Sequence, residues 1–108
     1  MKPIYTDTVQ LIAKLDWFYQ LTEKIESDKL FYSINYNITD ETKIIFAELT
    51  GNGASKLVNI NFNTNKGVKT GEFISSTTFA NIYFEVERIR FFSEVDVEFK
   101  LTVFQKLN

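Results

Sequence analysis

The side chains in this sequence that could do chemistry are carboxylates, amides, hydroxyls and amines, because the chain has neither His nor Cys. Without His, the commonest general base near neutral pH is missing, and Ser-His and Cys-His nucleophile pairs cannot form. The usual zinc and copper ligand sets are missing as well. We therefore expect a protein that is not an enzyme and that needs no cofactor and no metal.

Carboxylates do recur at strand spacing late in the chain. Glu94, Asp96 and Glu98 alternate with apolar residues, and Glu85 and Glu87 have the same spacing. Paired carboxylates can carry out acid-base catalysis or bind a hard cation. The alternative, which we favour, is a solvated acidic strand face whose charges pair with basic residues on neighbouring strands.

A row of amides is the more unusual feature. Asn59, Asn61, Asn63 and Asn65 lie two residues apart, which puts all of them on one face of a strand. Asn is depleted in strands, so this spacing calls for an explanation. Amides donate and accept hydrogen bonds, so the row could read base edges, sugar hydroxyls or a peptide backbone. The alternative is an edge strand kept soluble by uncharged polar residues.

Two clusters of adjacent aromatic residues, Trp17–Tyr19 and Phe91–Phe92, raise a related question. Successive residues of a strand point to opposite faces, so part of each cluster must leave the main core. An exposed ring beside Arg88, Arg90 or Lys66 would suit stacking of a nucleic-acid base. The alternatives are a second small core or an oligomer interface.

The composition and the net charge limit the classes of protein to which this chain can belong. The 108 residues suffice for one domain over 1–108, and the 16% of aromatic residues favours a β fold. The net charge of -2 argues against broad, sequence-independent nucleic-acid binding but allows a local basic patch. The lack of Cys fits a reducing compartment, and neither a signal peptide nor a membrane-spanning segment is seen. We expect a cytoplasmic protein without membrane insertion.

The elements that would position these residues are strands, because apolar and polar residues alternate along most of the chain. The clearest alternation runs over 95–103, with apolar residues at every odd position, and continues to about Gln105. After a lead-in over 1–8, the pattern predicts strands over 9–21, 30–38, 43–50, 57–62 and 72–92. Turns are predicted at 39–42, 51–53, 65–67 and 70–71, and loops at 23–29 and 67–70.

Helices are the alternative for two of these segments. Asp7 or Thr8 could cap a helix over 9–21, and apolar residues recur at helical spacing over 79–92 behind a Ser–Thr run. We favour strands for both. Antiparallel strands joined by turns then predict an all-β domain, a small and mostly antiparallel barrel or sandwich with little helix.

Segments over much of the chain resemble the small PrgU-like proteins encoded on pheromone-responsive conjugative plasmids of Gram-positive bacteria. The resemblance is carried by Asp7–Thr8, Leu15–Trp17, Gly51–Leu57 and Ala80–Phe84. It implies a β-barrel of the PUA-like kind. It also implies an RNA-binding regulator that limits production of the plasmid's surface adhesins and conjugation proteins.

These observations lead to a non-enzymatic regulatory module that binds RNA through a limited patch. The candidate RNA-binding residues are the amides of the row and the basic residues near it, namely Asn59, Asn61, Asn63, Lys66, Lys69, Arg88 and Arg90. The alternative is a protein-interaction or self-associating module that uses exposed aromatic rings and an open strand edge. A third hypothesis is a barrel that encloses a small apolar ligand.

Overall fold

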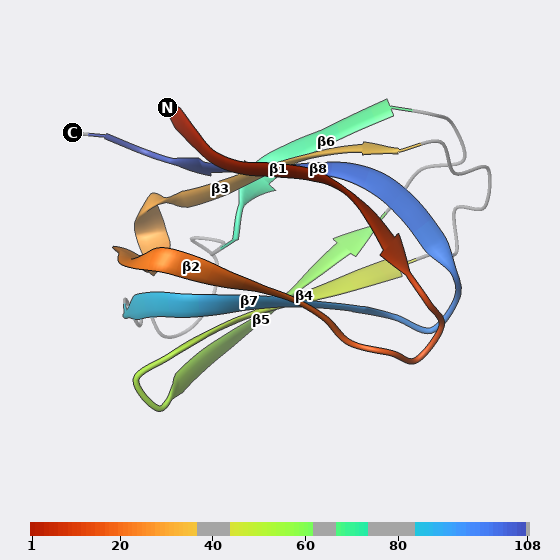
Figure 1. The fold of residues 1–108 in the computed structure, drawn as a ribbon, viewed down its shortest axis with the longest axis horizontal. Helices are drawn as coiled ribbons and strands as arrows, with labels where there is room; N and C mark the ends of the chain where they lie inside the picture. The colour runs from red at the N-terminus through yellow and green to blue at the C-terminus, as the bar shows by residue number, and fades with distance from the viewer. Residues whose placement is uncertain (37–43, 62–66, 74–83, 108) are drawn as a thin grey trace.

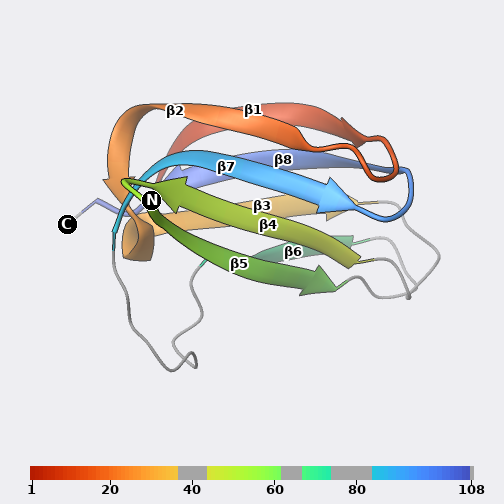
Figure 2. The same ribbon diagram turned by 90° about the horizontal axis from the view of Figure 1, so that it is seen from below.

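A computed structural model describes residues 1–36, 44–61, 67–73 and 84–107 and shows two four-stranded antiparallel sheets packed face to face (Figures 1 and 2). One sheet has the strand order β1-β8-β3-β6 and the other β2-β7-β4-β5. The strands are β1 (Lys2–Leu11), β2 (Trp17–Glu26), β3 (Leu30–Tyr36), β4 (Ile44–Gly51), β5 (Ala54–Asn61), β6 (Gly67–Glu72), β7 (Glu85–Ser93) and β8 (Val97–Gln105).

The all-β, antiparallel prediction is confirmed, and the architecture is a sandwich. The one helical element among the described residues is the 3₁₀ turn η1 (Ser27–Lys29). The PrgU-like resemblance implies a single closed barrel. The strands instead remain in two separate sheets. The two sheets meet through their apolar faces, as expected for alternating strands.

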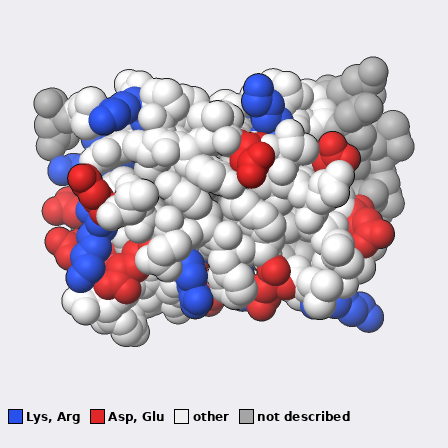
Figure 3. Space-filling model, in the orientation of Figure 1, with Lys and Arg blue, Asp and Glu red and all other residues white. Residues whose placement is uncertain are grey.

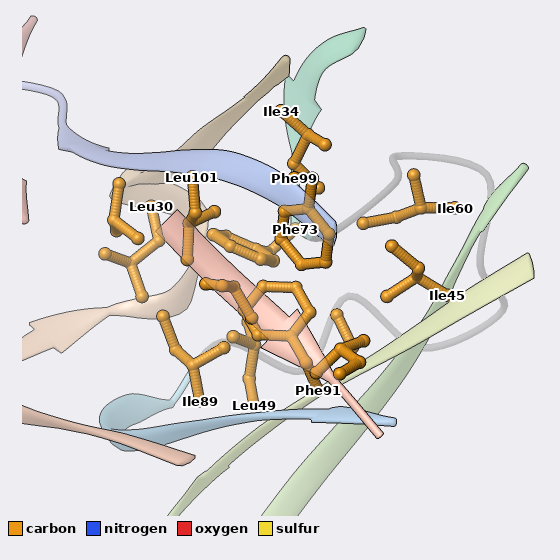
Figure 4. Close-up of a cluster of buried hydrophobic side chains, with 14 of the residues drawn as sticks. Leu30, Ile34, Ile45, Leu49, Ile60, Phe73, Ile89, Phe91, Phe99 and Leu101 are labelled. Carbon is orange, nitrogen blue, oxygen red and sulfur yellow. The ribbon is translucent and has the colours of Figure 1, made fainter. Parts of the chain in front are cut away.

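The core lies between the sheets and is built around three aromatic side chains with essentially no exposed surface: Phe73, Phe91 and Phe99 (Figure 4). The ring centroid of Phe91 lies 6.4 Å from that of Phe73 and 5.7 Å from that of Phe99. Phe91 belongs to one sheet and Phe99 to the other. These three aromatic side chains therefore join the two layers.

The segment 9–21 is not the single bent strand that its alternation predicts. The chain forms β1, turns over residues 12–16 and returns as β2 in the other sheet, and the predicted lead-in 1–8 belongs to β1. Lys14 takes a positive φ of 65° at the turn. Its N–H donates to the Ser93 carbonyl at 2.8 Å, and the Ala13 N–H donates to Asp96 Oδ1 at 2.7 Å. Contacts from the β7–β8 loop thus hold this turn in place.

Several other predicted boundaries also change. The segment 23–29 is mostly strand, because β2 continues to Glu26 before η1. The predicted loop 67–70 and turn 70–71 are wrong, since both lie within β6. The rings of Tyr36 and Tyr32 on β3 lie across from Gly67 and Gly71 and cover the space that their missing side chains leave. This cover allows a Gly-containing edge strand to form.

The remaining predicted strands are confirmed where the structure describes them, except that residues 95–96 lie in the β7–β8 loop before β8 begins at Val97. β3, β4, β5 and β8 correspond to the strands predicted over 30–38, 43–50, 57–62 and 95–103, and β4 has a strand on both sides, as its apolar composition indicated. β7 accounts for the C-terminal part of 72–92. The predicted turn at 51–53 is present, with positive φ values at Asn52 and Gly53. The turn predicted at 39–42 lies outside the described residues. So do residues 65–66 of the turn predicted at 65–67, whose last residue, Gly67, begins β6.

One side of the sandwich is closed by stacked tyrosines. Tyr5 on β1 and Tyr19 on β2 have ring centroids 4.0 Å apart and nearly parallel planes. Burial is the main cause that raises the pKa of both phenols above the ordinary value for Tyr. The Tyr5 hydroxyl donates to Asp7 Oδ2 at 3.0 Å. The β1 and β2 edges are thereby joined across the two sheets.

Candidate nucleic-acid interface

The outer face of the β2-β7-β4-β5 sheet gathers most of the predicted binding residues that the structure describes. On β7, Ile89 and Phe91 are buried between the sheets, so Arg88, Arg90 and Phe92 point to the outer side. Pairing register then fixes their neighbours on β4, β2 and β5. We call the resulting surface the outer face; it comprises Phe18, Gln20, Ile44, Phe46, Glu48, Thr50, Ser55, Leu57, Asn59, Asn61, Arg88, Arg90 and Phe92.

Arg90 lies at the centre of the outer face and pairs with two carboxylates. Its Nη1 is 2.7 Å from Asp16 Oδ1, and its Nε is 3.0 Å from Glu48 Oε1. The hydrogen bond that Arg90 donates to Asp16 is the largest cause that raises the pKa of Arg90, and burial opposes this rise. With both sides of the guanidinium engaged, Arg90 orders the β2-β7-β4 surface and does not offer its charge to a ligand.

Arg88 is placed differently, although it lies only two residues away on the same strand. Its guanidinium carbon sits 4.6 Å from the centroid of the exposed Phe18 ring. No carboxylate in the described part of the chain pairs with it. A guanidinium that stacks on an aromatic face keeps its N–H donors free for a phosphate or a base. Arg88 is therefore the cation of the outer face that a ligand can use.

Three phenylalanines line the outer face beside these arginines. Phe18 is 47% exposed, whereas Phe46 and Phe92 are half-buried with ring centroids 6.4 Å apart. Each is the outward-pointing member of its strand at that position. The prediction that the clusters Trp17–Tyr19 and Phe91–Phe92 send part of their rings outward is confirmed. Exposed rings on a sheet surface can stack bases whatever the sequence.

Asn59 and Asn61 complete the outer face along β5. Asn59 lies opposite Phe46 and Asn61 lies opposite Ile44, and both side chains are exposed. Neither amide makes a hydrogen bond to another described residue. The donors and acceptors of both amides therefore face solvent, and those of Asn59 do so beside the Phe46 ring. An amide beside a ring can bond to the edge of a base that stacks on that ring.

A polar groove extends the outer face toward the β4–β5 turn. It encloses about 540 Å³ and is lined by Arg88, Gln20, Thr50 and Ser55 together with the turn itself. Gln20 Nε2 donates to the Glu87 carbonyl at 2.9 Å, and the Thr50 hydroxyl donates to the Arg88 carbonyl at 3.5 Å. These hydrogen bonds fix the side chains of Gln20 and Thr50, which line the groove beside Arg88.

The other predicted binding residues are not brought to this surface. Lys69 lies on β6 in the opposite sheet, across from the buried Ile34. Asn63 and Lys66 lie outside the described residues. Phe46 and Glu48 on β4 belong to the outer face but were not predicted to do so. The signal was the run of residues 44–47, which is apolar on both faces.

The acidic row near the C-terminus has structural partners. Asp96 accepts the Ala13 N–H, and Glu98 Oε2 accepts a bond from Gln10 Nε2 at 3.4 Å. Within the described ranges, no three carboxylates are grouped so that they could hold a metal ion. On the side seen in Figure 3, Lys and Arg side chains alternate with Asp and Glu across wide uncharged areas. On this side neither sign of charge forms a patch of its own.

Comparisons with family models, with curated proteins and with solved structures find no match for this chain. Among the described residues, no helix is long and apolar enough to cross a membrane.

Proposed function

We propose that this domain is a non-enzymatic regulatory module that binds single-stranded RNA across the outer face of the β2-β7-β4-β5 sheet. The observation that carries the proposal is a single sheet surface with one exposed ring, that of Phe18, and two half-buried rings. Beside them, within the described part of the chain, two amides have no hydrogen-bond partner and one guanidinium has no carboxylate partner. Rings such as Phe18 stack bases, the amides of Asn59 and Asn61 bond to base edges, and Arg88 contacts a phosphate.

The charge of the outer face supports a single-stranded ligand. Arg90 is neutralised by Asp16 and Glu48, so Arg88 is left as the available cation among the described residues of this face. Few phosphates can be neutralised, and contacts to bases must therefore supply most of the affinity. A duplex keeps its bases stacked and paired, so it offers little to this surface.

The regulatory part of the proposal is supported by the resemblance to the PrgU-like proteins, which implies an RNA-binding negative regulator of conjugation and surface-protein production. The aromatic and amide content of the outer face supports RNA binding independently of that resemblance. The space between the sheets is filled by core side chains such as Phe73 and Phe91 (Figure 4). This filling favours RNA binding over transport of an apolar ligand inside the fold.

Titration of a fluorescently labelled pool of single-stranded RNA, followed by anisotropy at low and at physiological salt, tests the proposal. We expect saturable binding that persists at physiological salt. The slope of log K against log salt should be small, about -0.7 for each phosphate that is neutralised. A duplex pool should bind far more weakly. Absence of binding at both salts, or equal binding of the duplex pool, would contradict the proposal.

A matched pair of variants locates the binding surface. Phe18→Ala removes an exposed ring of the outer face and is expected to weaken RNA binding by about tenfold or more, since stacking contributes about 1–3 kcal/mol per base. Phe104→Ala removes a half-buried ring that points outward from β8 in the other sheet and should leave binding unchanged. Equal effects of the two variants would rule out the outer face as the site.

A further inference from the structure

The two sheets have four edge strands, and three of them carry features that discourage pairing with another chain. β1 contains Pro3 and a break in register between Pro3 and Tyr5. β2 has a break in register between Gln20 and Ile25. β6 contains two glycines and Lys69 within six residues. Each of these edges is irregular, charged or poor in side chains for a partner strand to pack against.

The fourth edge strand, β5, lacks such protection. Its eight residues keep an unbroken register with β4, from Gly51 opposite Ala54 to Ile44 opposite Asn61. It has no Pro and no Gly, and Lys56 is its one charged residue. Leu57, at the middle of the strand, is 54% exposed. A long, regular and nearly uncharged edge is a template for pairing.

The β4–β5 turn fixes which backbone groups of β5 are available. Asn52 and Gly53 have φ values of 55° and 80°, as in a two-residue type I′ hairpin turn. Residues that flank such a turn exchange hydrogen bonds, and the bonded positions then alternate along the strand. Ala54 and Val58 therefore bond to β4, whereas Ser55, Leu57 and Asn59 direct their N–H and C=O groups to the open edge. No described strand pairs with that edge.

We propose that β5 pairs antiparallel with β5 of a second copy of this chain, about a two-fold axis at Leu57. Leu57 then lies opposite Leu57 of the partner subunit, and Ser55 lies opposite Asn59 of the partner subunit. These pairs match an apolar residue with an apolar one and a hydroxyl with an amide. The groups that face the open edge on Ser55, Leu57 and Asn59 all gain partners in this register.

Neighbouring registers that keep the same sheet face are less favourable. Moving the axis to Lys56 would place two like charges directly opposite each other, which is destabilising. Moving it to Val58 would place Leu57 opposite Asn59 of the partner subunit, an apolar residue against an amide. The register centred on Leu57 joins the two outer faces into one eight-stranded surface. The pairing itself does not depend on RNA binding.

Cysteine cross-linking tests both the dimer and its register, because the chain has no Cys of its own. Residues opposite each other in a hydrogen-bonded antiparallel pair have Cα atoms about 5.5 Å apart, which suits a disulfide. Under mild oxidation, Leu57→Cys is expected to form a covalent dimer. Val68→Cys, at a 58% exposed position on β6, is the control and should remain largely monomeric. Faster cross-linking of Val58→Cys than of Leu57→Cys would overturn the proposed register.

Sedimentation equilibrium without oxidant gives an independent result. The wild-type chain should show a dimer mass that dissociates on dilution from high to low micromolar concentration. Leu57→Lys would place two ammonium groups opposite each other at the two-fold axis and should raise the dissociation constant of the dimer about tenfold or more. Val68→Lys should leave the dissociation constant unchanged. A wild-type mass of a monomer throughout, together with equal cross-linking of Leu57→Cys and Val68→Cys, would overturn the proposal.

Discussion

The Phe91→Ala variant is expected to lose about 3–5 kcal/mol of the free energy of unfolding, the usual cost of truncating a fully buried Phe. Phe91 has no exposed surface, and its ring centroid lies 5.7 Å from both Trp17 and Phe99 and 6.4 Å from Phe73. The cavity would open where the two sheets meet, and strands held by ladders on both sides cannot collapse to fill it. Urea unfolding followed by the fluorescence of Trp17 measures the loss.

The neighbouring residue supplies the control for this prediction. Phe92 is on the same strand but points to the outer face, where its half-buried ring lies 6.4 Å from Phe46. Phe92→Ala removes the same atoms from a partly solvated position and should cost about 1 kcal/mol. Since a domain of this size is stable by about 5–15 kcal/mol, only the core variant should approach global unfolding. Equal losses would show that the core is not centred on Phe91.

The Gly51→Ala variant is expected to lose about 3 kcal/mol, at the upper end of the usual cost of overpacking. A Cβ atom at Gly51 would overlap the backbone carbonyl oxygen of Glu85 and lie 3.1 Å from the Glu87 nitrogen. These are backbone atoms, so a change of side-chain rotamer cannot relieve the overlap. Either β4 or β7 would have to shift, and the groove next to Arg88 would change with it. Urea unfolding and RNA titration should therefore both report this substitution.

The Gly53→Ala variant is the control that distinguishes steric overlap of a Cβ atom from strain in the backbone. Gly53 has a φ of 80°, which an L side chain adopts at a cost of roughly 1–2 kcal/mol, but a Cβ atom there meets nothing within 4 Å. Gly53→Ala should therefore destabilise less than Gly51→Ala and leave the sheet unshifted. The reverse order would mean that the close approach of β4 to Glu85 does not constrain the fold.

The sequence predicted strands well where apolar and polar residues alternate and where nearby residues determine the turn. The alternation of 95–103 and the Asn52-Gly53 turn are examples, and both are present. It could not place the β1–β2 turn, because odd residues stay apolar from Val9 to Leu21 straight through it. The turn contains neither Gly nor Pro. Its conformation is held by Ser93 and Asp96, residues about eighty positions away, and such contacts leave no local signal.

The sequence missed β6, and it left a helix as the alternative to the strand that contains β7, for two further reasons. β6 contains two glycines that normally indicate a turn, but Tyr32 and Tyr36 on a neighbouring strand cover them. On β7, Val86 and Ile89 are both buried although they are three residues apart. The register with β2 is irregular at this point, because residues 21–24 of β2 lie opposite the single residue Glu87 of β7. That spacing is what made a helix an alternative for 79–92.

The sequence predicted the types of residue in the candidate site better than it predicted which residues share one surface. The alternation of β7 correctly puts Arg88 and Arg90 on one face of that strand, and the alternation of β5 does the same for Asn59 and Asn61. Only the strand order shows that the two faces form a single surface. The different situations of the two arginines depend on Asp16 in the β1–β2 turn and on Glu48 of β4. Sequence spacing alone therefore could not tell the free cation from the paired one.

Mapping of amide chemical shifts in isotope-labelled protein during titration with single-stranded RNA tests the central claim most directly. We predict that the shifts concentrate on β2, β7, β4 and β5, with the largest changes around Phe18, Phe46, Asn59 and Arg88. The β1-β8-β3-β6 sheet should change little. Shifts confined to that second sheet, or none at saturating RNA, would contradict the assignment of the outer face as an RNA-binding surface.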